Sequence, residues 1–375
     1  MNEQQPPFFS PPQKNMYASI IFFLSSFLSF LPFFLSFSFL SFFFFCVPVD
    51  MTSSTPLLKR RFVQVGETPG DNEGTFSVLQ FNTLADCNAT TSAFPKVPEE
   101  FLDWKKRVQP LLDEIFGYDA DFICLQEVDP KTIDFIKDFI NYHLRRPGRR
   151  LYSMTYILKR DGREGILLLY KEKFYMRAQR TLDHAIYSGI STNFQGNQKS
   201  TICHFHFADN DNENDLHYSS ITIAVTHLKS KAGFEKRRLF QGKTIVGTLG
   251  DTTIAGYPII IAGDFNAEPD EEVMEEFTHA GFKSAYCIGG RHPDFTSFKY
   301  KEDREQLRTI DYILHNQEAR PIEILEIPDK RRLQGHDGTS ADHIGLPSAT
   351  YPSDHVALFS RFAYQKGQAL SSSSS

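Results

Sequence analysis

The sequence is poor in cysteine and contains no closely spaced cysteine pair. Five cysteines occur, at Cys46, Cys87, Cys124, Cys203 and Cys287. This spacing argues against a zinc module and offers no disulfide framework, which suits a reducing compartment. We therefore expect a cytoplasmic protein. A net charge of −6 excludes a globally basic nucleic-acid coat, but it is compatible with a local basic cleft.

Charge is absent from most of the first fifty residues. No charged side chain occurs between Asn15 and Val49, and residues 22–45 contain only Phe, Leu, Ser and Pro. This run is long enough to span a bilayer, which needs roughly 20 apolar residues, and it is too long for a cleaved signal peptide. Because all four amino acids can have pyrimidines in the first two codon positions, we favour a translated pyrimidine tract followed by Met51 as the true start. A membrane-anchored or mitochondrial form is the alternative if residues 1–50 are translated.

The rest of the chain alternates between predicted strands and helices. Apolar runs of strand length occupy residues 76–85, 121–129, 164–171, 221–230, 258–262, 307–315 and 352–362. Helical spacing predicts helices over 98–121, where Pro110 should kink or split the helix, and over 236–249. Since several strands follow one another directly, the pattern predicts an α/β fold, a two-sheet α/β sandwich with outer helices.

The division of the chain follows from the same pattern. Residues 51–74 form a predicted flexible lead-in, 75–364 a single catalytic domain and 365–375 a disordered, serine-rich tail. Residues 209–216 have no apolar pattern and are predicted to form a hairpin loop.

Several predicted strands share an unusual feature, because each is apolar and then ends in a side chain that is costly to bury. These residues are Asn82, Glu127, His227, Asp264 with Asn266, and Asp354 with His355, while Asp311 lies inside a further apolar run. A single residue of this kind is usually a turn former or a helix cap. Their recurrence predicts convergence on one point, where a cation removes the several kcal/mol that an unpaired buried ion costs.

The residue types at this predicted site indicate which cation it would bind. Carboxylate and amide oxygens, with no thiolate and few imidazoles, favour Mg²⁺ or Mn²⁺, which also contact substrate phosphate. The histidines then orient, protonate or stabilise a phosphoryl group. Together the set predicts hydrolysis of a phosphoester.

Six short motifs carry a family resemblance. They are "LQFNTL", "CLQEVD", "VTHLKS", "IAGDFNAEP", "TIDYIL" and "YPSDH". Their order resembles that of the exonuclease–endonuclease–phosphatase superfamily. The longer stretches "VTHLKSKAGFEKRRLFQG", "GDFNAEPDEEV" and "YPSDHVAL" are similar to the nocturnin-like group of its deadenylase branch. The resemblance covers about residues 75–364 and implies a metal-dependent phosphoester hydrolase.

The resemblance implies a set of metal-side residues. Glu127 would be the principal magnesium ligand, Asn82 would help to hold metal and phosphate, and Asp354 would be a further metal-side carboxylate. Glu268 is predicted instead to cap the loop before Pro269.

The resemblance also implies catalytic roles. Asp264 would orient or deprotonate the attacking water, and Asn266 would bind phosphate oxygens in the transition state. His227 and His355 would contact the phosphate, with Asp311 orienting His355.

Basic residues are predicted to bind the other phosphates of the substrate. Lys229 and Lys231 follow the "THL" motif at alternate positions, so they would share one face of an extended strand. Lys231 stands where the resembling group has Arg, which keeps the charge but loses the planar fork. Lys159 and Arg308 are further predicted contacts, and residues 236–238 are expected to form a solvated helix face.

Two substrates remain open: the 2′-phosphate of NADP(H), removed to give NAD(H), and the 3′ end of poly(A) RNA. We favour NADP(H), because the net charge is negative, no leucine-rich repeat adaptor precedes the catalytic body and no aromatic stacking platform is obvious. A DNA endonuclease, a lipid or inositol phosphatase and a catalytically dead binding protein are less favoured. No obligate protein partner is indicated, and a membrane is relevant only if the N-terminal apolar run is real.

Overall fold

The computed structural model describes residues 58–144, 151–184, 197–208, 218–252, 256–335 and 343–366. The apolar run at 22–45, the predicted hairpin loop at 209–216 and the tail beyond residue 366 lie outside the described residues. Within the described residues, no helix is both long enough and apolar enough to cross a membrane.

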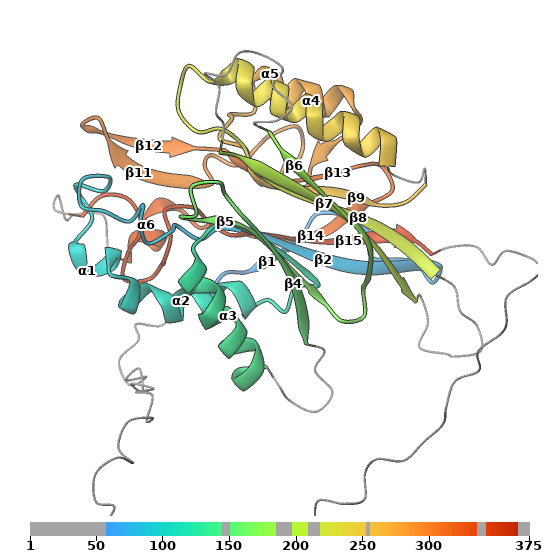
Figure 1. Ribbon diagram of the computed structural model, residues 1–375, viewed down its shortest axis with the longest axis horizontal. Coiled ribbons are helices and arrows are strands. Elements are labelled where there is room, and N and C mark those ends of the chain that lie inside the picture. Colours follow the sequence, from blue (N-terminus) through green and yellow to red (C-terminus); the bar gives the residue numbers. More distant parts are fainter. Residues whose placement is uncertain are drawn as a thin grey trace, which may run out of the picture. The chain divides into compact units, whose positions relative to one another are not determined.

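Two β-sheets form the centre of the fold (Figure 1). The first has seven strands in the order β1-β14-β15-β2-β3-β5-β4. Their bounds are β1 Phe62–Gln64, β2 Glu73–Asn82, β3 Phe122–Val128, β4 Tyr152–Leu158, β5 Gly165–Lys171, β14 Arg320–Leu325 and β15 Leu358–Gln365. The strand β1 lies inside the predicted lead-in.

The second sheet has six strands in the order β10-β13-β9-β8-β7-β6, and β11 and β12 form a separate hairpin. Their bounds are β6 Tyr175–Asp183, β7 Lys199–Ala208, β8 Tyr218–His227, β9 Ile259–Asp264, β10 Lys283–Ser284, β11 Ser297–Lys301, β12 Arg304–Arg308 and β13 Asp311–His315. Two central pairs are parallel, β2 with β3 and β8 with β9, and the other pairs are antiparallel.

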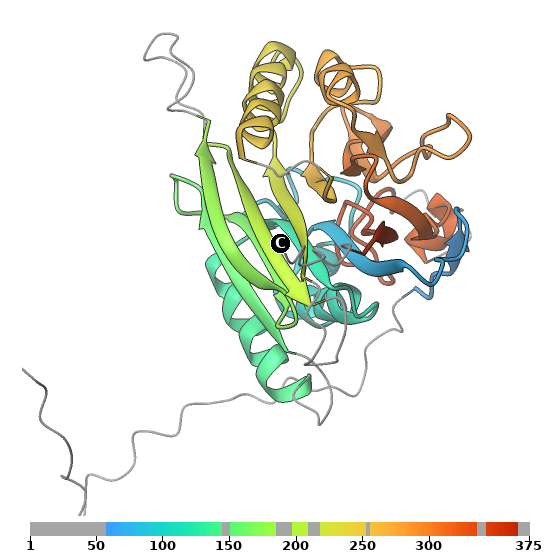
Figure 2. The same cartoon turned by 90° about the vertical axis from the view of Figure 1, so that its right-hand side faces the viewer.

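Helices cover the outer faces of both sheets. Their bounds are α1 Glu99–Leu102, α2 Trp104–Phe116, α3 Pro130–His143, α4 Glu235–Thr252, α5 Glu272–His279 and α6 Lys330–Gln334. One apolar cluster joins α2 and α3 to the first sheet, and another joins α4 and α5 to the second. The third major cluster lies between the sheets and includes Phe76, Phe122 and Ile260. The predicted two-sheet sandwich with outer helices is confirmed (Figures 1 and 2).

The helix predicted over 98–121 breaks at a different residue from the one expected. Asp103 is extended, at φ −62° and ψ 118°, and its carboxylate accepts a hydrogen bond from the amide of Lys105, so it caps α2. Pro110 lies inside α2 without splitting it. Lys106, whose carbonyl Pro110 leaves without an amide donor, is exposed, so water can satisfy that carbonyl.

Two of the predicted strands depart most from their predicted bounds. The run 307–315 is divided between β12 and β13, because the chain turns between Arg308 and Asp311 and its amides there bond to side chains of neighbouring segments. The run 352–362 becomes a strand only at Leu358, because the preceding residues bond to the segment that begins β11. Both departures place polar residues in loops beside the strand ends.

Candidate active site

Side-chain alternation aims one row of each central strand into the layer between the sheets. On β2, Phe76 and Val78 pack in that layer, and Asn82 continues the same row. Asp264 continues the inward row of β9, and His227 continues that of β8. Because β8 and β9 are parallel and pair His227 with Asp264, these residues emerge at one edge of the layer.

Glu127 reaches this edge through a β-bulge. Phe122 and Cys124 of β3 face the layer between the sheets, so alternation alone would turn Glu127 to the opposite face. The pairing of β3 with β5 shifts register between Leu125 and Val128, and Glu127 has φ +53°, in the left-handed region. A bulge redirects a side chain in this way, and a non-glycine residue in such a conformation typically costs about 1–3 kcal/mol. Strain of this kind clusters at functional sites.

Asn82 connects two of the predicted site carboxylates. Its Nδ2 donates to Asp264 Oδ2 at 3.0 Å and to Glu127 Oε1 at 3.3 Å. The other oxygen of Glu127 accepts from Asn88 Nδ2 at 2.7 Å and from the amide of Ala85 at 3.3 Å. Asn88 belongs to none of the motifs, so sequence reasoning missed it; only the path of the loop after β2 brings it to Glu127.

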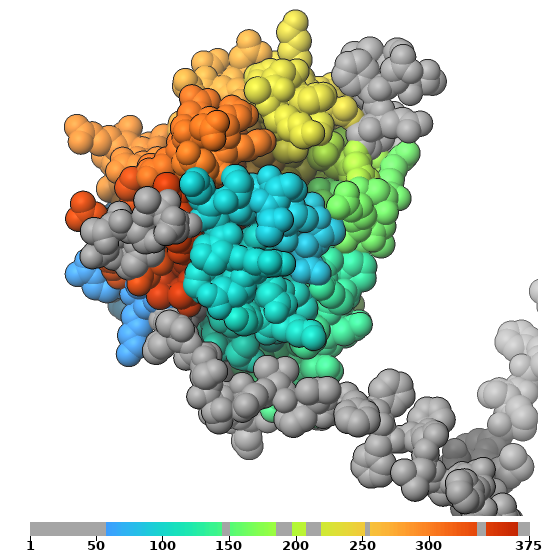
Figure 3. Space-filling model, turned by 90° about the vertical axis from the view of Figure 1, so that its left-hand side faces the viewer, coloured from blue at the N-terminus to red at the C-terminus, as the bar shows by residue number. Residues whose placement is uncertain are grey.

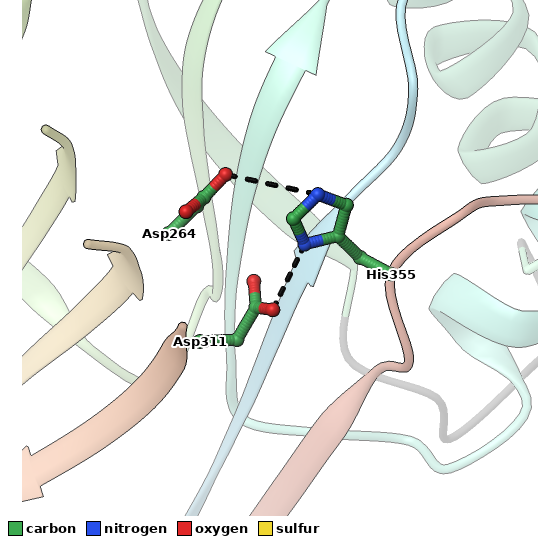
Figure 4. A group of neighbouring side chains, drawn as sticks. All are labelled: Asp264, Asp311 and His355. Atoms are coloured by element: carbon green, nitrogen blue, oxygen red, sulfur yellow. Dashed lines mark hydrogen bonds and ion pairs between the residues drawn. The ribbon is translucent and has the colours of Figure 1, made fainter. Parts of the chain in front are cut away.

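Asp264, Asp311 and His355 form a compact buried group (Figure 4). Asp311 lies opposite Asp264 in the pairing of β13 with β9. Its Oδ2 accepts from His355 Nδ1 at 2.8 Å, and His355 Nε2 lies 3.8 Å from Asp264 Oδ2. Asp311 is held further by Thr296 Oγ1 at 2.7 Å and by Gln80 Nε2 at 3.1 Å. The ring of His355 is therefore fixed with one nitrogen turned toward Asp264.

The two site histidines differ in charge. Burial disfavours the charged form of His355, but the carboxylates of Asp311, Asp354 and Asp264 outweigh burial and raise the pKa of His355 to about 10. Burial, followed by the nearby ammonium of Lys159, holds the pKa of His227 well below its ordinary value. Burial also raises the pKa of Asp264 to about 6, although the His355 imidazolium opposes this change. The site thus combines an imidazolium, a neutral imidazole and a carboxylate that titrates near neutral pH.

Lys299 is a site residue that the sequence analysis did not identify. Its ammonium forms a close ion pair with the carboxylate of Asp354, which is 1 % exposed. Burial opposes ionisation of both groups, but their mutual attraction raises the pKa of Lys299 and lowers that of Asp354. A bridge between Ser297 and His355 places β11 beside the loop that carries Asp354. In the sequence this lysine resembles an ordinary solvated position of a hairpin, so no signal distinguished it.

The predicted shared face of Lys229 and Lys231 is wrong. β8 ends at His227, and Lys231 has φ +81°, so the segment after the strand is not extended. The Nζ atom of Lys229 lies over the ring of Phe234, 4.7 Å from its centroid, and Lys231 is exposed. Both lysines therefore lie on a loop at the rim of the site.

Lys159 lies closer to the buried site than the rim lysines. Its Nζ is 3.3 Å from His227 Nδ1 and forms a close ion pair with Glu164. Arg308 instead contacts the loop after β9, with its Nε 2.9 Å from Glu268 Oε1. Glu268 also accepts from the amide of Thr309, so it joins this loop to the start of β13.

Asn266 follows β9 with φ +52°, a second non-glycine residue of the site in the left-handed region. Its Nδ2 donates to the carbonyl of Leu228 at 3.2 Å. The prediction of a solvated face at residues 236–238 is wrong for Arg238, which is only 2 % exposed.

The donor set of the site fits a divalent cation. Four carboxylates gather there: Asp264, Asp311, Asp354 and Glu127. His355 and Lys299 form ion pairs with two of them, Asp311 and Asp354. Carboxylate and amide oxygens are the donors that Mg²⁺ prefers. The half-buried carboxylate of Glu127 could hold such an ion, whereas Asn82 turns its amide nitrogen toward Glu127 and Asp264 and its oxygen toward the amide of Leu84.

Comparisons with known proteins agree with this architecture. The sequence pattern of the Endonuclease/Exonuclease/phosphatase family matches residues 79–355. Nocturnin of Xenopus laevis is 28 % identical over 314 residues, covering 81 % of this chain and 76 % of that protein. The Ccr4 3′-5′-exoribonuclease subunit of the CCR4-Not complex from Yarrowia lipolytica is 24 % identical, covering 78 % of this chain and 48 % of that protein.

The fold is also similar to a solved structure. The human Nocturnin catalytic domain with bound sulfate superposes with a TM-score of 0.59 at 24 % identity, covering 83 % of this chain and 100 % of that one. The chain belongs to the endonuclease/exonuclease/phosphatase family, as its motifs predicted, and is a nuclease or phosphatase of that family.

Proposed function

We propose that this protein is a Mg²⁺-dependent phosphoester hydrolase that removes the 2′-phosphate of NADP(H) to give NAD(H). The observation that carries the proposal is the buried arrangement of Asp264, His355 and Asp311 beside Asn82 and Glu127. In this arrangement a carboxylate and an imidazolium face one another across 3.8 Å. A base can activate the attacking water and a cationic hydrogen-bond donor can stabilise the phosphate, which are two contributions to hydrolysis of a phosphoester.

Each group has a defined task in this mechanism. Asp264, with its pKa raised to about 6, orients the attacking water and accepts its proton. His355 remains protonated and donates through Nε2 to an oxygen of the scissile phosphate, while Asp311 holds its Nδ1. Asn266 donates to a further phosphate oxygen. Magnesium, when bound, supplies positive charge beside the phosphate.

The reaction consumes one water for each phosphate released. The oxygen of the attacking water bonds to phosphorus as the bond between phosphorus and the ribose 2′-oxygen breaks. The ribose oxygen takes up a proton from solvent, Asp264 returns the proton of the attacking water to solvent, and inorganic phosphate leaves. No oxidation occurs, so NADPH gives NADH and NADP⁺ gives NAD⁺.

A cluster of cations at the rim supports a substrate with several phosphates. The ammonium of Lys229 has its pKa lowered by partial burial and then by Lys231 and other nearby cations, which include Arg237 and Lys159. A dinucleotide carries a pyrophosphate in addition to its 2′-phosphate. Cations that repel one another are stabilised most when such an anionic group binds beside them. The net charge of −6 gives the chain no overall basic character, which an extended RNA track would favour.

The second candidate is a 3′-5′ exoribonuclease acting on poly(A). The similarity to the Ccr4 exoribonuclease subunit favours it, although this chain spans about half of that relative's length. The same site would serve, with water attacking the terminal phosphodiester.

An assay of the purified full-length protein with NADPH and with oligo(A) separates the two substrates. The proposal predicts Mg²⁺-dependent release of inorganic phosphate from NADPH. A Glu127→Ala variant is the inactive control. Release of AMP from oligo(A) without phosphate release from NADPH would overturn the NADP(H) assignment in favour of the exoribonuclease.

A further inference from the structure

Arg238 is the most completely engaged cation close to the substrate-binding rim. It lies on α4 and is 2 % exposed. Its Nη1 donates to the carbonyls of Lys229 at 3.0 Å and Lys231 at 2.9 Å. Its Nε and Nη2 contact the two carboxylate oxygens of Glu271 at 2.5 and 2.8 Å. One guanidinium therefore joins the loop at 228–231 to the residue that precedes α5, and α4 and α5 lie side by side on the second sheet (Figures 1 and 2).

The opposite end of the same loop is fixed to the catalytic centre. The amide of Leu228 donates to the carbonyl of Asp264 at 2.9 Å, and Asn266 Nδ2 donates to the carbonyl of Leu228 at 3.2 Å. The amide of Lys229 donates to Gln241 Oε1 at 3.0 Å. Beyond this point Lys231 adopts φ +81°, a conformation that a lysine keeps only when its surroundings impose it. In this conformation the Lys231 carbonyl accepts from Arg238.

The side chain of Glu271 binds Arg238 and does not cap its own helix, α5. It occupies the N-cap position of α5, yet its side chain accepts no capping hydrogen bond there. An N-cap carboxylate ordinarily accepts from the first turn of its helix. Glu271 instead binds Arg238 through both oxygens, in the bidentate geometry that suits arginine.

We propose that Arg238 is a positioning residue that fixes the substrate-phosphate loop, residues 228–231, by clamping its backbone to Glu271. The inference rests on the proposed function in one respect, because it takes Lys229 and Lys231 as contacts for phosphates of the substrate. Arg238 does not itself touch substrate, since all three of its nitrogens are occupied by protein oxygens. Its charge is balanced by Glu271, so its effect is geometric.

The clamp controls substrate binding more than it controls the chemical step. The lysines lie at the rim, whereas Asp264 and His355 are held by separate hydrogen bonds in the buried site. Loosening the loop should weaken binding of phosphates distant from the reacting one. A lysine at position 238 keeps the charge but cannot make four contacts in the fork geometry, so Arg238→Lys should weaken binding of those phosphates.

The closing experiment separates binding from chemistry. Binding of adenosine 2′,5′-bisphosphate is measured by calorimetry, and hydrolysis of p-nitrophenyl phosphate, a monoester that has no distant phosphate, reports the chemical step. We expect Arg238→Lys to raise Kd about five- to tenfold, the usual scale for one hydrogen bond, with kcat for the small ester within about twofold. Glu271→Gln, a milder change, should act in the same direction. Lys236→Gln, which removes an exposed charge from the same helix, should change neither quantity.

A coupling measurement tests whether Arg238 acts through the loop. In a Lys231→Ala background, Arg238→Lys should raise Kd less than in the wild type. Any of three results would overturn the clamp. The first is an unchanged Kd in both Arg238→Lys and Glu271→Gln, and the second is an equal loss of binding and of small-ester hydrolysis. The third is a wild type that does not bind adenosine 2′,5′-bisphosphate. If the wild type fails to hydrolyse NADPH while Arg238→Lys still weakens binding, the NADP(H) assignment fails and the clamp stands.

Discussion

Replacing Asp311 by Asn removes one buried charge from the site with almost no change in shape. The carboxylate accepts hydrogen bonds from His355 Nδ1 at 2.8 Å, Thr296 Oγ1 at 2.7 Å and Gln80 Nε2 at 3.1 Å. Asparagine fits the same space and can keep some of these contacts, but it cannot stabilise an imidazolium by charge. The variant therefore tests whether the activity depends on a protonated His355.

The magnitude follows from the pKa of His355. Carboxylates led by Asp311 raise this pKa from 6.5 to about 10, a difference of 3.5 units. At 1.36 kcal/mol per unit, the folded site favours the imidazolium by about 5 kcal/mol. Loss of the leading carboxylate removes a large share of this preference and also frees the ring to rotate. We expect kcat to fall by about 100- to 10,000-fold, the range for removal of a positioned acid or base.

The assay is the initial rate of phosphate release from pH 6 to pH 10. The variant should lose activity at a lower pH than the wild type, because its imidazolium deprotonates earlier. Asp294→Asn, which neutralises an exposed aspartate near the site hairpin, is the matched control and should behave as the wild type. Urea unfolding checks that the variant is folded. A kcat within threefold of the wild type, with an unchanged pH profile, would refute the assignment of His355 as the charged donor.

Three further predictions concern other parts of the molecule. Asn88→Ala should weaken Mg²⁺ binding about 10- to 100-fold in calorimetry, because Asn88 orients Glu127; an unchanged affinity would contradict this role. Burial lowers the pKa of His184 to about 4, so its neutral form stabilises the fold above pH 6.5, and about 3 kcal/mol should be lost as the pH falls from 6.5 to 4. His184→Gln should flatten that part of the pH dependence of urea unfolding, and an equally steep loss would exclude His184 as its source. Glu114→Gln should lower the free energy of unfolding by about 3–5 kcal/mol, because it leaves the buried guanidinium of Arg60, 2.8 Å away, without its counter-charge. Glu100→Gln, which removes an exposed carboxylate, should lower it by less than about 1 kcal/mol.

The fold could be predicted from the sequence because the apolar runs of strand length and their short connections are present in the structure. The predicted sandwich is present, but strand ends moved where backbone groups bond to distant side chains, as between Arg308 and Asp311. Such bonds join residues far apart in the chain, so periodicity alone does not reveal them.

The site residues likewise divide into those that spacing predicts and those that only long-range contacts bring together. Alternation along β2, β8 and β9 explains why Asn82, His227 and Asp264 meet, and this part was accessible from spacing. The bulge that redirects Glu127 depends on pairing with β5, and Lys299 reaches Asp354 only because the β11–β12 hairpin folds over the site. The surface on the left of Figure 1, seen face-on in Figure 3, shows segments around residues 85–105, 230–245 and 290–310 meeting on one side of the molecule. Contacts made across such distances have no local signature.

The most direct test of the account is a Mg²⁺ titration of phosphate release from NADPH, comparing the wild type with Glu127→Gln. We predict a wild-type rate that rises with Mg²⁺, saturates and is abolished by chelation. Glu127→Gln should need far more Mg²⁺ and reach a much lower rate, while its unfolding midpoint stays near that of the wild type. Equal rates for the two proteins at every Mg²⁺ concentration, or a wild-type rate insensitive to chelation, would contradict a metal-dependent phosphoester hydrolase centred on Glu127.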